Sequence, residues 1–294
     1  DCCTTRAIRE CASYAPRRGS LQRLSVRKHK TVGIKMNSGY DELQMFFGDD
    51  YKVSDYITIH QPTVGEIMEF GERRYYSMLT QLCAIPSDMK STLWDVLEVD
   101  WNKMSDFELF AFNCHSLRPQ DTSIILGDLD LSTYTHSVKD KENDELALLQ
   151  YSQVDENSPP EITGIITESD YYNMVGYLRK LHGFTIKREK ARNRITRDVM
   201  IEEDRQKIEL SKNKSYVSQL KNLISAMLTY PGFKYKKSEL RECGIYEFMD
   251  AVQRSQIYVS TDALLHGMYS GMIDTKKINK KQFNWMREIG RAHV

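Results

Sequence analysis

Two capping motifs constrain the fold of this chain most strongly. Thr63 is followed three residues later by Glu66, and Ser105 is followed in the same way by Glu108. In such a pair the hydroxyl and the carboxylate bond to the first free amides of a helix, so each pair marks a helix start. Apolar residues at helical spacing follow both pairs. The chain is therefore expected to be built mainly from amphipathic helices.

Further helices are expected where capping residues and helical spacing occur together. The helices predicted in this way are 64–85, 87–98, 105–117, 169–182, 216–228, 238–243, 245–258 and 261–269. The segment 187–214 is charged and sparsely apolar, which fits either an exposed helix or a mobile linker.

Strands are predicted in only a few places. Residues 56–60 alternate and are rich in β-branched side chains, and the mainly apolar run 146–151 is a further candidate strand. The segments 123–126 and 131–135 read as two strands around a turn. The fold class expected is α+β and predominantly α-helical, with a small β element in the N-terminal half and a helical C-terminal half.

The two halves of the chain differ in charge. Residues 36–160 hold 8 lysines and arginines against 23 acidic residues, a net charge of −15, whereas residues 161–288 hold 23 against 16, a net charge of +7. Such asymmetry indicates parts with different surfaces. With a polar, turn-rich stretch at 155–160, it predicts an acidic mixed α/β domain over 36–158 and a basic helical domain over 159–288.

Both ends of the chain have unusual sequences. The last six residues, 289–294, are what a common sequencing adapter encodes in this frame, and we expect them not to belong to the natural protein. Residues 1–35 hold nine lysines and arginines and three of the six cysteines. We interpret them as translated upstream DNA, with Met36 as the start, and a basic targeting peptide is the alternative.

Few enzyme classes find support in the sequence. The motifs of P-loop, dinucleotide-binding, serine-hydrolase and zincin proteins do not occur. Cys114 with His115 and His136 could form a nucleophile pair, and Asp128 with Asp130 could bind a metal ion, but a core cysteine and a polar turn are the preferred explanations. We predict no catalytic residue, no metal site and no cofactor. No apolar run of about 18 residues occurs, so no membrane span is expected.

A dense run of cations lies in the second half. Its candidate contact residues are Lys187, Arg188, Lys190, Arg192, Arg194 and Arg197. Clustered cations of this kind bind nucleic-acid phosphates and release counterions. The alternatives are a solvated helix face, because acidic residues follow at once, and docking to the acidic half of the same chain or of a second copy.

Several aromatic residues are candidates for a protein interface, since two adjacent tyrosines on a helix cannot both face one core. These candidates are Tyr75, Tyr76, Tyr171, Tyr172 and Trp285.

Two stretches resemble proteins from the tail-morphogenesis region of phages of Gram-positive bacteria. The first runs from Tyr56 to Ile67 and continues through Gly71-Glu72 and Tyr75-Tyr76. The second runs from Glu247 through 264–271 to Asn284-Trp285-Met286. The resemblance covers most of 50–286 and lies in the overall residue pattern, without a diagnostic motif. It implies a tail assembly chaperone, a non-catalytic protein that coats the tape-measure protein until tail tube subunits replace it.

The expected function is therefore that of a phage morphogenesis factor in the host cytoplasm, which binds a tape-measure or tail protein and no membrane. The alternative is a nucleic-acid-associated phage protein that uses 187–197. An enzyme without a recognisable motif is a third hypothesis.

Overall fold

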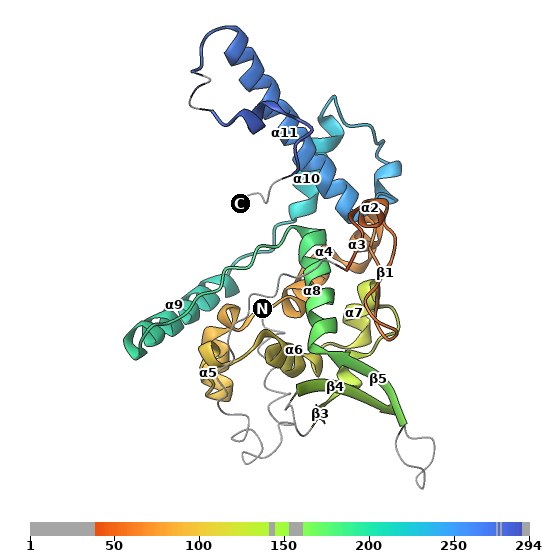
Figure 1. Cartoon of the computed structure of the whole chain (residues 1–294), viewed down its shortest axis with the longest axis vertical. Helices are drawn as coiled ribbons and strands as arrows, with labels where there is room; N and C mark the ends of the chain where they lie inside the picture. Colours follow the sequence, from red (N-terminus) through yellow and green to blue (C-terminus); the bar gives the residue numbers. More distant parts are fainter. Residues whose placement is uncertain (1–38, 141–144, 153–160, 275, 277, 290–294) are drawn as a thin grey trace.

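A computed structural model describes residues 39–140, 145–152, 161–274, 276 and 278–289. The predictions for residues 1–35, for the turn at 155–160 and for residues 290–294 lie outside these ranges. The described chain is mostly helical, with two small antiparallel sheets between residues 51 and 167, so the predicted α+β class with predominant helix is confirmed. Figure 1 shows two projections from a central body, one formed by α9 and the other by the C-terminal part of α11.

The elements of the first part of the chain are α2 (Glu42–Phe47), β1 (Tyr51–Lys52), β2 (Thr58–Ile59), α3 (Val64–Phe70), α4 (Glu72–Leu82), η2 (Pro86–Asp88), α5 (Lys90–Leu97), η3 (Trp101–Lys103), α6 (Asp106–Cys114), α7 (Pro119–Leu126), η4 (Leu131–Thr133), β3 (Thr135–Asp140) and β4 (Glu145–Ser152). The elements of the second part are β5 (Glu161–Thr167), α8 (Glu168–His182), α9 (Arg194–Lys212), α10 (Gln219–Thr229), η5 (Glu239–Arg241), α11 (Ile245–Tyr269) and η7 (Lys280–Phe283).

Both predicted capping boxes are confirmed. The Thr63 hydroxyl accepts the amide of Glu66 at 3.1 Å while the Glu66 carboxylate accepts the amide of Thr63 at 2.7 Å, and Ser105 and Glu108 do the same at the start of α6. The helix predicted over 64–85 is divided, because Gly71 takes a φ of 99° and separates α3 from α4. That conformation is open to glycine and strained for other residues.

Two of the predicted strands are wrong. Residues 123–126 belong to α7, which begins at Pro119, where the missing amide of proline costs nothing and its fixed φ suits the first turn. The segment 131–135 begins instead with the short 3-10 helix η4, because the Asp130 carboxylate accepts the amide of Ser132 at 3.0 Å. In both places the residues that begin a helix or turn, Pro119 and Asp130, decide the local structure, although the isoleucines and threonine favour a strand.

The larger sheet has the order β3-β4-β5 and is antiparallel throughout, and β1 pairs with β2 in a separate ladder. The run 146–151 is confirmed as a strand within β4. Its partner β5 was not predicted. The β4–β5 pair joins residues on either side of the predicted domain boundary at 158, and one hydrophobic core extends across it from Met45 to Val252.

Helix α8 lies at the centre of this core (Figure 1). Strand β5 leads directly into α8, so the helix is capped by Thr167 with Asp170 and begins at Glu168, one residue before the predicted start. The Tyr171 ring packs against Phe110 of α6 with centroids 4.8 Å apart, and the Tyr177 ring stacks on Tyr51 at 4.7 Å. Helix α11 packs against α8 as well.

The segment 187–214 is resolved as a loop followed by α9. The two helices predicted over 245–258 and 261–269 are one continuous helix, α11. Thr261, where the second of these helices was predicted to begin, is buried within α11, and its side chain donates a hydrogen bond to the Gln282 carbonyl at 3.1 Å. The predicted helix over 238–243 is reduced to η5.

Two acidic side chains each cap a helix in the other part of the chain. The buried Asp204 of α9 accepts the amide of Ser91 at 2.9 Å and its hydroxyl at 2.7 Å, at the start of α5. Glu72 of α4 accepts the amides of Gln219 and Leu220 at 2.8 and 2.9 Å, at the start of α10. These bonds satisfy amides that lack helical partners and fix α9 and α10 on the first part.

Replacing Asp204 with Ala is expected to destabilise the chain by about 2 kcal/mol, because two buried donors of Ser91 lose their acceptor. Urea unfolding measures the change, and amide exchange should rise in α5 and α9 first. Glu203→Ala, at an exposed neighbouring position, is the matched control. Equal effects of the two changes would show that the contact contributes nothing.

A buried histidine links α8 to α4. His182 Nδ1 donates to the Leu178 carbonyl at 2.8 Å, so in the neutral ring Nε2 accepts from the Tyr75 hydroxyl at 2.6 Å. Burial lowers the pKa of His182 to about 4, because the imidazolium would be desolvated.

Stability is expected to fall in mild acid. Between pH 6.5 and about 4 the unfolded chain binds a proton at His182 and the folded chain does not, so stability present above pH 6.5 is lost as the pH falls through this window. The loss amounts to about 2–3 kcal/mol between pH 7.5 and 4.5. Urea unfolding at both pH values measures it. His182→Gln should remove that part of the pH dependence, and an unchanged slope in this variant would contradict the assignment.

Candidate functional site

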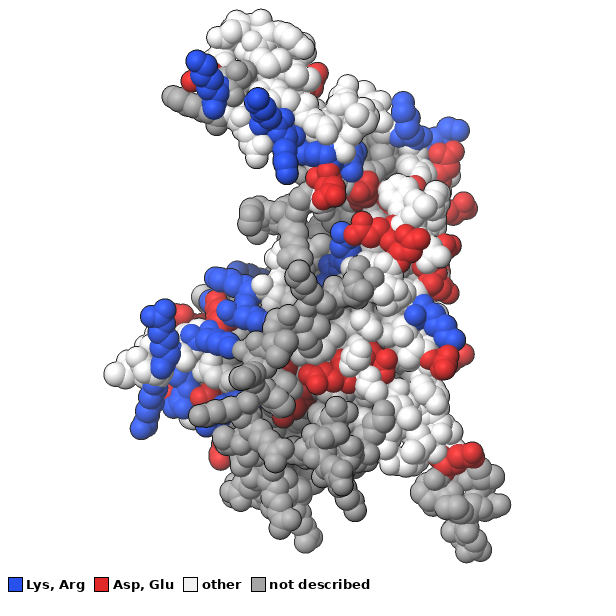
Figure 2. Space-filling model, in the orientation of Figure 1, with Lys and Arg blue, Asp and Glu red and all other residues white. Residues whose placement is uncertain are grey.

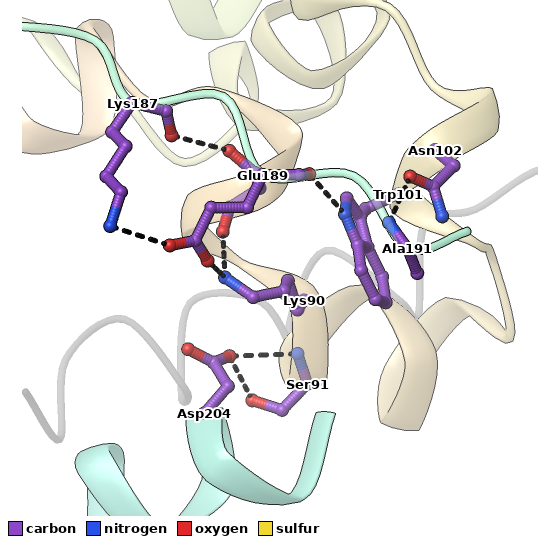
Figure 3. Close-up of polar contacts among 9 residues, drawn as sticks. Lys90, Ser91, Trp101, Asn102, Lys187, Glu189, Ala191 and Asp204 are labelled. Atoms are coloured by element: carbon purple, nitrogen blue, oxygen red, sulfur yellow. Dashed lines mark hydrogen bonds and ion pairs between the residues drawn. The ribbon is translucent and has the colours of Figure 1, made fainter. Parts of the chain in front are cut away.

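The loop between α8 and α9 carries the N-terminal part of the predicted cationic cluster. We call residues 183–193 the basic strap. It leaves α8 through Gly183, whose φ of 66° lets the chain turn, and it ends at Asn193, which caps α9. Figure 3 shows the strap lying along α5 and η3, where the Trp101 indole donates to the Glu189 carbonyl at 3.0 Å and Asn102 accepts the amide of Ala191 at 3.2 Å.

A buried lysine of the first part binds the strap. The Lys90 ammonium is 2.6 Å from the Ser87 carbonyl and 2.9 Å from the Glu189 carboxylate. Its attraction lowers the pKa of the Glu189 carboxyl. The Ser87 hydroxyl also donates to the Lys187 carbonyl at 3.4 Å. A charge that leaves water needs such partners, so the strap is part of the folded structure at this point.

Arg188 is an anchor of the strap. Its guanidinium donates two hydrogen bonds, at 2.9 and 2.6 Å, to the Asp106 carboxylate, which is only 2 % exposed. This bidentate geometry is the strongest form of arginine–carboxylate contact. Arg188 therefore neutralises a buried acid and is not available to a nucleic acid.

Arg197 is a second anchor, located in the first turn of α9. Its guanidinium lies 4.2 Å from the centroid of the Trp94 ring and pairs with Asp100 at 3.6 Å and with Asp198 at 3.0 Å. Further along the helix, Arg205 pairs with Asp95 of α5. The basic second half is thus docked on acidic groups of the first half, which was one of the three interpretations of the cluster.

The remaining cations of the cluster face solvent. Lys187 and Arg194 are almost fully exposed, and their ion pairs with Glu189 and Asp198 are long, at 3.4 and 3.7 Å. Lys190 and Arg192 are exposed and have no ion pair within the described residues. In Figure 2, lysines and arginines gather over α9 and over the C-terminal part of α11.

The predicted interface aromatics are divided by burial. Tyr75 and Tyr171 are fully buried, so they pack in the core and cannot contact a partner. Tyr76 and Tyr172 are partly buried and pack against the same core. Trp285 is about half exposed and meets the exposed Tyr258 edge to face, with centroids 6.0 Å apart. Adjacent tyrosines on one helix can both be covered because several elements surround α4 and α8.

The face of α9 that points away from α5 carries an apolar row that the sequence analysis did not single out. Ile195, Val199 and Leu210 are 77, 52 and 68 % exposed. Together with Gln206 they are spaced by four, seven and four residues and form one stripe along the helix. The opposite stripe, with Ile201 and Asp204, is buried. We call this the α9 row.

The C-terminal lobe, residues 255–289, is a second apolar surface. Beyond Val252 no described hydrophobic side chain is buried. The lobe is held by polar contacts, among them those of Arg254 to the Trp285 and Arg287 carbonyls at 3.2 and 2.7 Å. The exposed hydrophobic side chains of the lobe are Tyr258, Val259, Tyr269, Met272, Trp285 and Met286. Apolar surface of this kind is typical of a protein contact.

The other candidate chemistry finds little support. Cys114 is fully buried, and burial raises its pKa far above the usual range, so the thiolate that a nucleophile requires is disfavoured. Asp130 caps η4 through Ser132. Across the described ranges, no group of three or more His, Cys, Asp or Glu residues could hold a metal ion. In the same part of the chain, no helix is long and apolar enough to cross a membrane.

Comparison with known protein families places a similarity in the C-terminal part of the chain. Residues 211–290 are similar to the family model described as the YomV second domain, which belongs to a phage-type protein family. The match begins at the end of α9 and includes α10 and α11. No curated protein and no solved structure matches the chain. The similarity supports the expected phage origin, and the role in tail assembly stays a prediction.

Replacing Arg188 with Ala is expected to destabilise the chain by about 2 kcal/mol, because the buried Asp106 carboxylate loses its cation. The loss of stability is smaller than for a fully buried ion pair, because Arg188 is itself half exposed. Denaturant unfolding measures it, with Lys190→Ala as the control, for which we expect a change within about 0.5 kcal/mol. A stable Arg188→Ala variant would contradict the anchoring role.

Proposed function

We propose that this chain is a non-catalytic phage morphogenesis protein that binds another phage protein, in the manner of a tail assembly chaperone for a tape-measure or tail component. The observation that carries the proposal is the α9 row. It lies on a helix that projects from the body, and its apolar side chains have no partner within the described residues (Figure 1).

The position of the row supports recognition of an amphipathic helix. An exposed helix with an apolar stripe at three- and four-residue spacing offers the same type of surface that helices use to pair with one another. The exposed Glu202, a charged neighbour along α9, would form part of the polar rim that such contacts have.

The C-terminal lobe supports the same function independently. Its exposed methionines and aromatic rings adapt to partners of varied shape, which suits a protein that must cover a long chain. The lobe is part of the segment that is similar to a phage domain. Action in the host cytoplasm follows from this proposal, since phage particles are assembled there.

Nucleic-acid binding is the second candidate, and the observation that favours it is the exposure of Lys187, Lys190, Arg192 and Arg194. The loss of Arg188 and Arg197 to internal ion pairs reduces the charge available for phosphate contacts. We therefore rank it below protein binding.

The test is co-expression with the tape-measure protein of the same phage, followed by nuclease treatment and co-purification. Ile195→Ser, Val199→Ser and Leu210→Ser together should reduce the retained partner at least tenfold, because the apolar contact area is lost. Glu203→Ser with Lys207→Ser, on exposed polar positions of the same helix, is the control and should retain it.

The nucleic-acid alternative predicts a different pattern. Complexes would be lost on nuclease treatment, would weaken steeply with salt, and would respond to Lys190→Ala, Arg192→Ala and Arg194→Ala instead of the α9 row. Nuclease-resistant retention that is unaffected by the triple serine variant would remove the α9 row from the proposal.

A further inference from the structure

A cavity of about 210 Å³ lies where the ends of α4 and α8 meet the basic strap. At about 30 Å³ for each water in the liquid, it has room for about seven waters, which is the size of a single amino-acid residue. Its lining includes Ile85, Asp88, Arg179, Phe184, Ile186 and Lys187. These residues are distinct from the α9 row and from the C-terminal lobe.

Arg179 has no acidic partner within ion-pair distance in the described part of the chain. Its one hydrogen bond runs from Nη2 to the Cys83 carbonyl at 2.7 Å, which leaves most of its five N–H donors without a protein acceptor. Three arginines near the strap differ, since Arg188, Arg197 and Arg205 each pair with carboxylates. A half-buried guanidinium with free donors is suited to an anionic ligand.

The one acid in the lining does not neutralise Arg179. The Asp88 carboxylate accepts the amide of Ile85 at 3.1 Å and caps η2. Burial raises its pKa, against the opposing effects of that hydrogen bond and of Lys90 and Arg179. With Lys187 on the strap, the lining holds two cations and one acid, so its net charge favours an anion.

Part of the cavity lining is apolar. It includes Ile85 and two partly exposed residues of the strap, Phe184 and Ile186. The Phe184 amide donates to the Arg179 carbonyl at 2.8 Å, and the Phe184 ring packs on His182 with centroids 5.6 Å apart. Preformed apolar walls with a few polar groups are the usual features of a ligand site.

We propose that this cavity binds an α-carboxylate that carries an apolar side chain, such as the C-terminal leucine or phenylalanine of another polypeptide. The carboxylate lies on Arg179, with Lys187 contributing charge, and the apolar side chain lies between Ile85 and the two strap residues Phe184 and Ile186. The proposal does not depend on the function of the α9 row, and either can fail without the other.

The test measures fluorescence polarisation of a labelled Gly-Ser-Gly-Ser-Gly-Leu peptide with the full chain. Saturable binding is expected for the free carboxylate, with at least tenfold weaker binding for the C-terminal amide and for the peptide ending in glycine. Competition by N-acetylleucine separates the sources: equal potency indicates a small-molecule carboxylate, and weaker potency indicates a chain terminus. Both results support a site for an α-carboxylate that carries an apolar side chain.

Variants assign the binding to the cavity. Arg179→Met should weaken binding at least tenfold, and Asp88→Asn should strengthen it, because the opposing charge is removed while a side-chain oxygen still accepts the Ile85 amide. Arg74→Met is the control, since that arginine pairs with Asp121 on another surface. If Arg179→Met does not fold, Ile186→Glu replaces it, because Ile186 is partly exposed and a carboxylate there would compete for Arg179. No saturable binding, equal binding of the amide, or unchanged binding by folded cavity variants would overturn the proposal.

Discussion

Burial of the apolar face of α8 is the constraint on which the other packing depends. Its apolar face requires cover from α6 and α11, and His182 at its end requires a donor, which Tyr75 of α4 supplies. Because β5 runs directly into α8, the three-stranded sheet is fixed at the same time. The exit of the chain at Gly183 then sets the path of the basic strap, and the path of the strap sets where α9 begins and the direction in which it projects.

Electrostatic pairing between the two halves completes this arrangement. Asp106, Lys90 and Asp204 are buried polar groups, and each would be costly without the partner that the other half provides. The cations of the second half therefore have two roles. Some satisfy buried acids and hold the strap and α9, and the others remain on the surface. A further close contact lies at Gly65, where an added side chain would come within 2.6 Å of the Arg241 carbonyl oxygen, so the segment around Arg241 packs closely on α3.

The surfaces that remain after this packing are unusual for a self-contained protein. One projecting helix has an apolar row that faces solvent, and the C-terminal lobe exposes rings and methionines without a buried hydrophobic centre in its described residues. Both are features of proteins that complete their packing with a partner. The similarity of the C-terminal segment to a phage domain agrees with this view. The cavity beside Arg179 is a smaller candidate site, and its lining combines charged and apolar side chains, unlike the two apolar surfaces.

The sequence by itself determined the elements whose signals are local. The capping boxes at Thr63 and Ser105 and the strand within β4 could be predicted because neighbouring residues decide them. Tertiary contacts decided the rest. Residues 123–126 include two isoleucines yet are helical, Thr261 stands at a predicted helix start yet is buried in mid-helix, and Arg188 belongs to a cationic run yet pairs with a buried acid 82 residues away. The orphan donors of Arg179 were equally invisible in the sequence. Which charges are satisfied, and which apolar residues stay exposed, depends on distant parts of the chain, and only the folded structure brings these together.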